Sequence, residues 1–226
     1  MVQQDRAVAG QAVYTPGVLS IYDWLVLSLS NRYIWKCPTQ QIEAHYNRHL
    51  SANHLDVGVG TGYFLDRCRF PSTQPRIALM DMNSNTLVYA LSRIARYQPE
   101  TYQQNILLPL EESIAPFDSI GVNYLLHCLP GVMAEKTILF DHLRPLMKPG
   151  CRVFGSTLLQ GDVPRGGLAR WLMRLYNRKA IFSNEEDTVA GLRQALTQRF
   201  VDVEIEVIGC VALFAARFDA PTVSGR

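Results

Sequence analysis

The segment LDVGVGTG, residues 55–62, decides the expected fold of this 226-residue chain. An apolar run from residue 54 to residue 59 predicts a buried strand, and a helical pattern follows from Tyr63. Glycine permits positive φ angles and a close approach of the backbone to a ligand. The unpaired N–H groups of the helix that follows favour a polar or negatively charged ligand group. The segment therefore predicts a ligand-binding turn between a strand and a helix.

Two acidic residues near this turn narrow the class of ligand. The dinucleotide pattern G-x-G-x-x-G requires glycine where Tyr63 stands, and Asp56 precedes the first glycine by two positions, where it would repel a pyrophosphate. A carboxylate there suits a ligand with an ammonium group, so an NAD-dependent dehydrogenase is disfavoured. Asp81 ends the next predicted strand, 19 residues after Gly62. A carboxylate at that spacing is the usual acceptor for ribose hydroxyls.

Strands and helices alternate along the rest of the chain, which predicts an α/β fold. The expected strands are 54–59, 76–82, 102–107, 117–125, 152–158, 201–208 and 211–218. The expected helices are 19–29, one beginning at Pro38, 63–69, 83–97, 132–147, 167–179 and one that follows a capping box at 183–186. We expect a doubly wound, mostly parallel seven-stranded sheet whose last strand is antiparallel, capped by the two N-terminal helices. One domain, 1–226, would hold an arm and cap (1–50), a core (51–218) with an insert (159–183), and a tail (219–226).

The composition excludes several classes of protein. Hydrophobic residues make up 48% and charged residues 19%, as in ordinary globular proteins, and the net charge of +2 is too small to predict a nucleic-acid or membrane partner. The 5 cysteines are widely spaced with no C-x-x-C, so neither a disulfide framework nor a zinc site is expected, and no other metal-binding pattern occurs. The N-terminal residues lack the apolar run of a signal peptide, and no apolar stretch could span a membrane. These features predict a cytoplasmic protein.

Four segments resemble motifs of the class I S-adenosylmethionine (SAM) dependent methyltransferases. LDVGVGTGYFL (55–65) and IALMDMN (77–83) resemble their first two motifs. FDSIGVNYLLHCLP (117–130) resembles their fourth-strand motif, and LRPLMKPG (143–150) resembles the stretch before their fifth strand. NRYIWKCP (31–38) is also similar to a branch of small bacterial and fungal natural-product methyltransferases. The resemblance implies a Rossmann-like fold, SAM as cofactor and S-adenosylhomocysteine (SAH) as its product.

The resemblance also implies a role in cofactor binding for nine residues, each at the end of a predicted strand or in the loop after it. It places Asp56 at the amino group, Gly58, Gly60 and Gly62 along the methionine, Asp81 at the ribose hydroxyls, Met82 on the adenine, Asn105 near the adenine amine, and Asn123 and Tyr124 beside the methyl group. The family often has aspartate where Asn105 stands, although an asparagine oxygen can also accept a hydrogen bond.

Two residues are candidates for catalysis. His127 follows the fourth strand directly, and an imidazole with an ordinary pKa near 6.5 suits a general base. A structural role for His127, bonded to the backbone or capping the turn at 128–130, is equally open. Tyr22 belongs to a group of aromatic residues in the opening helices that would wall an acceptor pocket if those helices fold over the strand ends.

The insert carries an amphipathic segment at 167–179, with an apolar stripe beside Arg170, Arg174 and Arg178 at helical spacing. It could pack on the core or on a second copy, form a lid over the acceptor, or face an anionic surface. The chain would be a monomer or a homodimer.

These features predict transfer of a methyl group from SAM to a small-molecule acceptor, at oxygen, in the biosynthesis of a metabolite or natural product. A nucleic-acid or protein methyltransferase is one alternative, although residues 123–126 read NYLL and not the NPPY of DNA amino-methylating enzymes. A SAM-binding protein that transfers no methyl group is the other alternative, because a fold does not fix a function.

Overall fold

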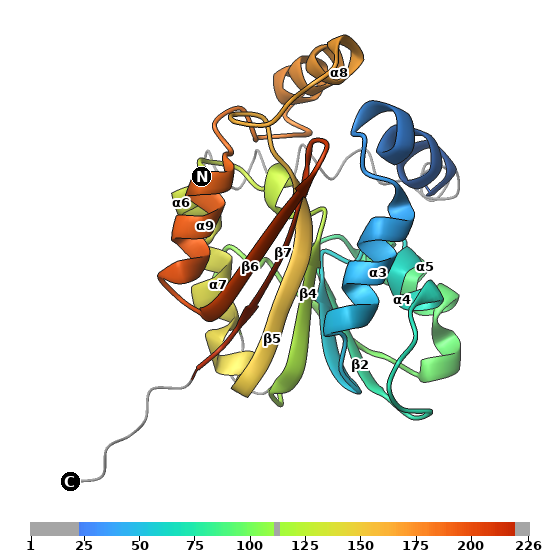
Figure 1. Cartoon of the computed structure of the whole chain (residues 1–226). Helices are drawn as coiled ribbons and strands as arrows, with labels where there is room; N and C mark the ends of the chain where they lie inside the picture. The colour runs from blue at the N-terminus through green and yellow to red at the C-terminus, as the bar shows by residue number, and fades with distance from the viewer. Residues whose placement is uncertain (1–22, 111–113, 220–226) are drawn as a thin grey trace, which may run out of the picture.

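The computed structural model describes residues 23–110 and 114–219, which form one seven-stranded sheet with helices on both faces (Figure 1). The strands are β1 (Asn53–Val57), β2 (Arg76–Asp81), β3 (Glu100–Gln103), β4 (Phe117–Asn123), β5 (Met147–Leu158), β6 (Val201–Ile208) and β7 (Val211–Arg217). Their spatial order is β3-β2-β1-β4-β5-β7-β6. β7 is antiparallel to β5 and to β6, and the pairs among the first five strands are parallel. The prediction of a mostly parallel sheet with an antiparallel last strand is confirmed.

The helices form two layers around the sheet in the Rossmann-like manner. The first layer holds α3 (Thr39–His49), α4 (Tyr63–Arg67) and α5 (Ser84–Arg93), and the second holds α6 (Met133–Lys136), α7 (Ile138–Leu143) and α9 (Val189–Thr197) (Figure 1). A π-type helix, η1 (Asp23–Ile34), precedes α3. α8 (Gly167–Arg178) follows β5 and projects beyond the end of the sheet. The helix predicted at 19–29 lies partly outside the described residues.

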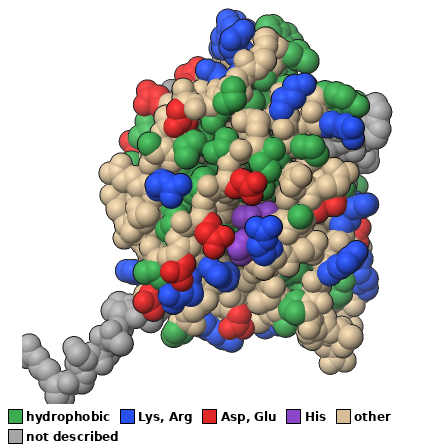
Figure 2. All heavy atoms as spheres, in the orientation of Figure 1, with side chains coloured by type: hydrophobic (Ala, Val, Ile, Leu, Met, Phe, Trp, Pro, Cys, Tyr) green, Lys and Arg blue, Asp and Glu red, His purple; other side chains and the backbone are tan. Residues whose placement is uncertain are grey.

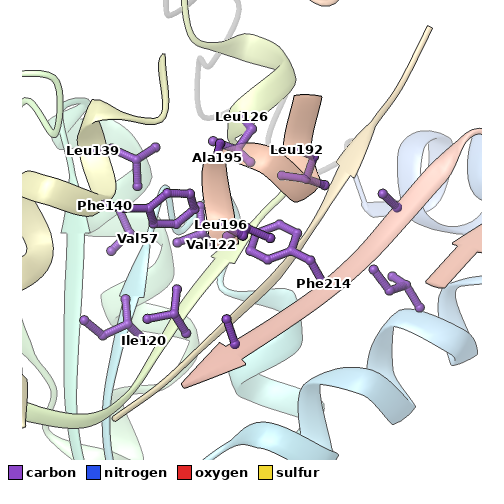
Figure 3. Close-up of a cluster of buried hydrophobic side chains, with 14 of the residues drawn as sticks. Val57, Ile120, Val122, Leu126, Leu139, Phe140, Leu192, Ala195, Leu196 and Phe214 are labelled. Atoms are coloured by element: carbon purple, nitrogen blue, oxygen red, sulfur yellow. The ribbon is translucent and has the colours of Figure 1, made fainter. Parts of the chain in front are cut away.

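The central strands are buried on both faces, as parallel strands between two helical layers must be. Figure 3 shows one core cluster, in which Val57, Ile120 and Val122 of the sheet meet Leu139 and Phe140 of α7 and Leu192 and Leu196 of α9. A second cluster lies under the first helical layer and includes Tyr46, Leu65, Leu87, Ala90 and Phe154. The first cluster includes Val57 of β1 and Val122 of β4, so it packs against the carboxyl ends of both strands.

Two predicted boundaries shift between β2 and β4. The helix expected at 83–97 ends at Arg93, and a single 3₁₀ turn, η2 (Ala95–Tyr97), follows it. The third strand spans Glu100–Gln103 and not 102–107. Arg76 donates to both carboxylate oxygens of Glu100, at 2.8 and 2.9 Å, which fixes this edge strand earlier in the chain. Residues 104–107 line a cavity, so the apolar Ile106 and Leu107 belong to a pocket wall and not to a strand.

The prediction of one continuous helix at 132–147 is wrong. The segment forms α6, α7 and a 3₁₀ turn, η4 (Arg144–Leu146), in which Pro145 takes one of the first positions. Thr137 Oγ1 donates to Met133 O at 2.7 Å, which competes with the helical pattern at the junction of α6 and α7. β5 begins at Met147 and so includes the Pro149–Gly150 step that we expected to separate helix from strand.

The capping box predicted at 183–186 is also wrong. α9 begins at Val189, and its N-cap is Thr188, whose hydroxyl accepts a hydrogen bond from the N–H of Gly191 at 2.9 Å. Residue Asn184 instead bridges the loop to the sheet, because its amide donates to Leu158 O at 3.0 Å. The sequence pattern of a cap was present, but tertiary hydrogen bonds hold this segment as a loop.

Candidate active site

A cavity of about 160 Å³ opens at the carboxyl edge of the sheet, where β1 and β4 lie side by side although β2 and β3 come between them in sequence. Ligands of open α/β sheets bind at such a reversal of strand order. Residues that follow β1, β2, β3 and β4 all line the cavity. Eight of the nine cofactor-binding residues expected from the sequence belong to this lining: Asp56, Gly58, Gly60, Asp81, Met82, Asn105, Asn123 and Tyr124.

The three glycines of the turn all adopt left-handed backbone conformations, with φ of 71° at Gly58, 53° at Gly60 and 70° at Gly62. Their surroundings differ. A Cβ atom on Gly62 would lie 3.1 Å from Cβ of Ala90, whereas a Cβ on Gly60 would meet nothing within 4 Å. Gly60 therefore leaves open space beside the cavity, while Gly62 lets α4 start close against α5 and does not line the cavity.

Asp56 is a buried carboxylate that faces the cavity, and a small polar network supports it. Its Oδ1 accepts a hydrogen bond from the hydroxyl of Tyr46 at 3.4 Å, and the same hydroxyl lies 2.9 Å from Nε2 of His54. Nδ1 of His54 lies 2.9 Å from Oγ of Ser119. Burial raises the pKa of Asp56, and the nearby His54 ring, with Nε2 3.9 Å from Oδ1, and the hydrogen bond from Tyr46 oppose that rise. A desolvated carboxylate of this kind is suited to a cationic ligand group.

β4 makes room for this network at Gly121, which pairs with Asp56 across the sheet. A Cβ atom at Gly121 would lie 2.8 Å from Oδ1 of Asp56 and 3.2 Å from the ring of His54. Our reading of the sequence missed Tyr46, His54 and Ser119 as parts of the site. The spacing of His54 and Asp56 could have placed both on one face of β1, because side chains alternate along a strand. Nothing in the sequence could have placed Tyr46 beside them.

Asp81 ends β2 and accepts a hydrogen bond from the N–H of Asn83 at 2.8 Å. Burial raises its pKa, and hydrogen bonds from Asn83, Thr86 and the glycine turn oppose the rise. Met82 follows it in the cavity wall. Asn105 also lines the cavity, but its Oδ1 already accepts from the N–H of Leu107 at 3.0 Å. The asparagine side chain thus stabilises its own loop.

Asn123 is the last residue of β4, Tyr124 follows it, and both line the cavity. Tyr124 has a positive φ of 52°, which is strained for a side chain of this size, and its hydroxyl donates to Oδ1 of Asn31 at 2.8 Å. Asn31 in turn donates to Oγ1 of Thr39 at 3.0 Å, so η1, α3 and the end of β4 are tied together. Oδ1 of Asn123 accepts from the hydroxyl of Ser156 at 3.1 Å.

His127, the candidate general base, does not line the cavity. Its side chain is buried, its ring lies edge-on against Phe182, and its Nδ1 accepts from the N–H of Leu158 at 3.3 Å. Burial lowers the pKa of His127 to about 3. This environment corresponds to the structural role that the sequence left open. Tyr22, the other candidate, lies outside the described residues.

The described part of the chain holds no cluster of three or more side chains arranged to bind a metal ion. All five cysteines are free thiols. Among the residues that the structure covers, no helix has the length and apolar character needed to cross a membrane.

Comparison with known proteins identifies the family to which this chain is similar. Residues 55–153 match the model of a methyltransferase domain. The chain is 39% identical to demethylluteothin O-methyltransferase of Streptomyces thioluteus, over 93% of this chain and 92% of that protein. It is 36% identical to the physcion biosynthesis cluster O-methyltransferase of Aspergillus chevalieri, over 92% and 94% of the two chains.

Solved structures share the fold at much lower sequence identity. DhpI, solved as a complex with SAH, superposes with a TM-score of 0.67 at 14% identity and covers 96% of this chain and 97% of its own. An O-methyltransferase family protein from Burkholderia thailandensis has a TM-score of 0.63 at 17% identity, over 97% of this chain and 63% of its own. With relatives this similar over nearly its whole length, the chain belongs to the SAM-dependent methyltransferases, and SAM is its cofactor.

Proposed function

We propose that this enzyme methylates a hydroxyl group of a small-molecule intermediate in the biosynthesis of a natural product. The observation that carries the proposal is that Asp56, Asp81 and Asn123 line one cavity. Asp81 and Asn123 end their strands and Asp56 is the residue before the end of its strand, and the three strands are neighbours in the sheet. The relatives described above are named O-methyltransferases, and one name refers to a biosynthesis cluster.

The residues in the wall fit SAM by their chemistry. Asp56 is a buried carboxylate with room for a cationic partner, and we assign it to the amino group of the methionine moiety. Asp81 at the end of β2 would accept from the ribose hydroxyls, with Thr86 and the backbone N–H groups of the turn holding it in place. The open space at Gly60 would admit the ligand close to the backbone.

The adenine would lie farther along the same wall. Met82 supplies an apolar surface for one face of the ring, and Ile106 and Leu107 supply more. Asn105 stands where a contact to the adenine amine is expected, although its oxygen also serves the N–H of Leu107. We assign Gly58 and Gly62 to the shape of the turn, and Asn123 and Tyr124 to the region of the methyl group.

SAM, when bound, supplies a methyl group on a positively charged sulfur, which is already an activated leaving group. The protein then needs mainly to position the acceptor and to exclude water. Tyr124 and the Asn31–Thr39 link fix the end of β4 against η1, at the side where an acceptor would enter. Ile181, three residues after α8, reaches the cavity wall from the insert. We infer that the insert and the N-terminal helices together form the acceptor pocket.

The surface charge of the protein favours a compact, partly apolar small molecule over a polyanionic partner. Figure 2 shows acidic and basic side chains interspersed on the face displayed, and the net charge of the chain is +2. Nucleic-acid binding is driven by concentrated positive charge. We therefore propose that the partner is a small molecule and neither a nucleic acid nor a membrane. We also propose that the enzyme works in the cytoplasm as a monomer or homodimer.

The first test is calorimetric titration with SAM, SAH and NAD on the wild type and on Asp81→Ala. We expect both adenosyl ligands to bind, NAD not to bind, and the substitution to weaken adenosyl binding by at least tenfold, because a buried ribose would lose its acceptor. Asp162→Ala, in the exposed loop before α8, is a matched control. Binding of NAD in place of SAM would contradict the assignment. A screen of hydroxyl-bearing acceptors with the loaded enzyme would follow.

A further inference from the structure

A chain of hydrogen bonds leads from the backbone of Ser51 to the carboxylate of Asp56. The N–H of Ser51 donates to Oγ of Ser119 at 3.0 Å, and that oxygen lies 2.9 Å from Nδ1 of His54. Nε2 of His54 lies 2.9 Å from the hydroxyl of Tyr46, which donates to Oδ1 of Asp56 at 3.4 Å. The elements α3, β1 and β4 therefore contribute to one polar chain that ends at a residue of the cavity wall.

The hydrogen atoms of this chain all point toward Asp56. A phenol has a single hydrogen, so a Tyr46 hydroxyl that donates to Asp56 accepts from His54. Nε2 of His54 is therefore the protonated nitrogen, and Nδ1 is an acceptor for the Ser119 hydroxyl. Hydrogen bonds aligned in one direction polarise one another, which strengthens the last of them. His54 thus acts on Asp56 through Tyr46, and its Nε2 also lies 3.9 Å from Oδ1 of Asp56.

Asp56 is the group that this chain serves, because a buried carboxylate has lost much of its hydration. It lines the cavity, and 9% of its side chain is exposed. Burial raises the pKa of Asp56, while His54 and Tyr46 oppose the rise. Tyr46 and the Cys68 thiol, the other titratable groups that face it in the described chain, stay neutral because burial raises their pKa values. The charge of Asp56 therefore depends on the chain that His54 joins.

The imidazole of His54 is held in place by packing. It is fully buried and stacks on Phe154, with 5.7 Å between ring centroids and 25° between ring planes. Tyr46 meets the same Phe154 ring edge-on at 5.2 Å. A Cβ atom at Gly121 would lie 3.2 Å from the imidazole, so a glycine on β4 provides the space that the ring occupies. The contacts fix the ring between Tyr46 and Ser119.

We propose that His54 is a positioning residue for the cofactor: through Tyr46 it supplies the polarised hydrogen bond that keeps the Asp56 carboxylate charged and oriented for the ammonium group of SAM. The inference rests on the proposed function, in which Asp56 binds that group. SAH carries the same ammonium group, so its binding reports on this role without any turnover. The role predicts a specific pH dependence of binding, because a carboxyl that has gained a proton no longer attracts an ammonium group.

The test is calorimetric titration with SAH at pH 6 and pH 8.5, on the wild type and on His54→Phe. The phenylalanine keeps an aromatic ring against Phe154 but removes both nitrogens. Loss of the chain should raise the pKa of Asp56, so the variant must release a proton in order to bind SAH at pH 6. We expect its affinity to be at least about tenfold below that of the wild type at pH 6 and within about threefold at pH 8.5. The ratio of the two proteins at each pH cancels the ionisation of SAH itself.

A second readout counts the proton directly. Titrations at pH 6 in two buffers with different enthalpies of ionisation give the number of protons released when SAH binds. We expect His54→Phe to release more of a proton than the wild type does, because its carboxyl starts in the neutral form.

Three further variants separate this role from a purely structural one. His49→Phe makes the same substitution against the same ring, since His49 lies 5.8 Å from Phe154, and it should bind SAH as the wild type does at both pH values. Asp56→Asn has no carboxyl to titrate, so its loss of affinity should be the same at both pH values. Ser119→Ala removes only the far end of the chain and should show the pattern of His54→Phe with a smaller amplitude.

An equal loss of affinity at pH 6 and pH 8.5 in His54→Phe, or no loss at either pH, would overturn the proposal. If His54→Phe does not fold, the same comparison on Ser119→Ala decides. A wild type that binds no SAH, or SAH binding that Asp56→Asn leaves unchanged, would overturn the inference together with the proposed function on which it rests. These two outcomes appear without any change at His54, so they are distinguishable from a failure of the inference alone.

Discussion

The hydroxyl of Tyr46 on α3 donates to the carboxylate of Asp56 on β1, and so connects the first helical layer to the strand that leads into the glycine turn. The same hydroxyl also lies within hydrogen-bond distance of His54. Tyr46 is 1% exposed, and burial keeps its pKa well above the usual value, so the hydroxyl remains a donor at any physiological pH. The orientation of the proposed ammonium-binding carboxylate therefore depends on a residue from outside the SAM-binding motifs.

Tyr46→Phe should weaken SAH binding by about tenfold, because Asp56 loses a buried hydrogen bond that orients it. The free energy of unfolding should also fall by about 1–2 kcal/mol, since the nitrogen of His54 loses a partner. Calorimetric titration and urea unfolding measure the two effects. Tyr33→Phe is the matched control, because Tyr33 is 59% exposed. Unchanged SAH affinity in Tyr46→Phe would show that Asp56 does not need this hydrogen bond.

The glycine turn gives a paired prediction. Gly60→Ala and Gly62→Ala both place a side chain at positive φ, which costs about 1–2 kcal/mol. Gly62→Ala should cost more stability, because the added carbon also meets Ala90 at 3.1 Å. Gly60→Ala should instead cost more SAH affinity, because its added carbon points into open space beside the cavity. Equal losses of stability and of affinity in the two variants would contradict this division of roles.

The buried ion pair between Lys136 and Asp187 should be important for folding. Lys136 Nζ lies 2.9 Å from Asp187 Oδ2, and both side chains are almost fully buried. Lys136→Met should lower the free energy of unfolding by about 3–5 kcal/mol, because it leaves a buried carboxylate without a partner. Lys136→Met combined with Asp187→Leu should recover most of that loss in urea unfolding.

The matched control for this pair lies on the surface. Lys148 and Asp118 are joined at 3.0 Å, with 45% and 47% of their side chains exposed. Lys148→Met should change stability by less than about 1 kcal/mol, because solvent screens an exposed pair. A similar loss in both single variants would mean that burial does not decide the strength of these pairs.

His127 should make the protein less stable in mild acid. Its pKa is about 3 in the folded protein and near 6.5 when unfolded, so the unfolded chain binds the proton more readily between these values. The stabilisation is complete above pH 6.5 and is lost as the pH falls toward 3. At pH 5 the loss for this group should be about 2 kcal/mol relative to pH 7.5.

His127→Gln tests this pH dependence, because the glutamine oxygen can still accept from the N–H of Leu158. Urea unfolding at pH 7.5 and pH 5 should show a smaller difference in the variant than in the wild type. His49, whose pKa is lowered to about 4 by burial, also contributes to the pH dependence of stability. Because both proteins contain His49, subtracting the change in unfolding free energy of the variant from that of the wild type removes this contribution. Parallel curves for the two proteins would show that His127 is not buried as a neutral ring.

Much of the cofactor site could be predicted because it follows from local sequence. A strand that runs into glycines at 58, 60 and 62 requires left-handed backbone at those positions, and an acid at the end of the next strand must lie at the same edge of a parallel sheet. The sequence placed β1 and β2 correctly for the same reason. At residues 183–186, where the prediction failed, a distant hydrogen bond from Asn184 to Leu158 outweighed the local pattern. Between α6 and α7 the bond from the Thr137 hydroxyl to Met133 O competes with the helix locally.

The sequence by itself determined the sheet, the turn and the side chains that stand at the strand ends, because periodicity and glycine conformation are properties of neighbouring residues. Only the tertiary structure decided how those side chains are oriented and which of them reach the cavity. Asn123 ends β4 and His127 follows the same strand, yet Leu158 and Phe182 enclose the imidazole, whereas Asn123 lines the cavity with its oxygen bonded to Ser156. These differences depend on contacts between segments far apart in the chain, and such contacts have no local signature.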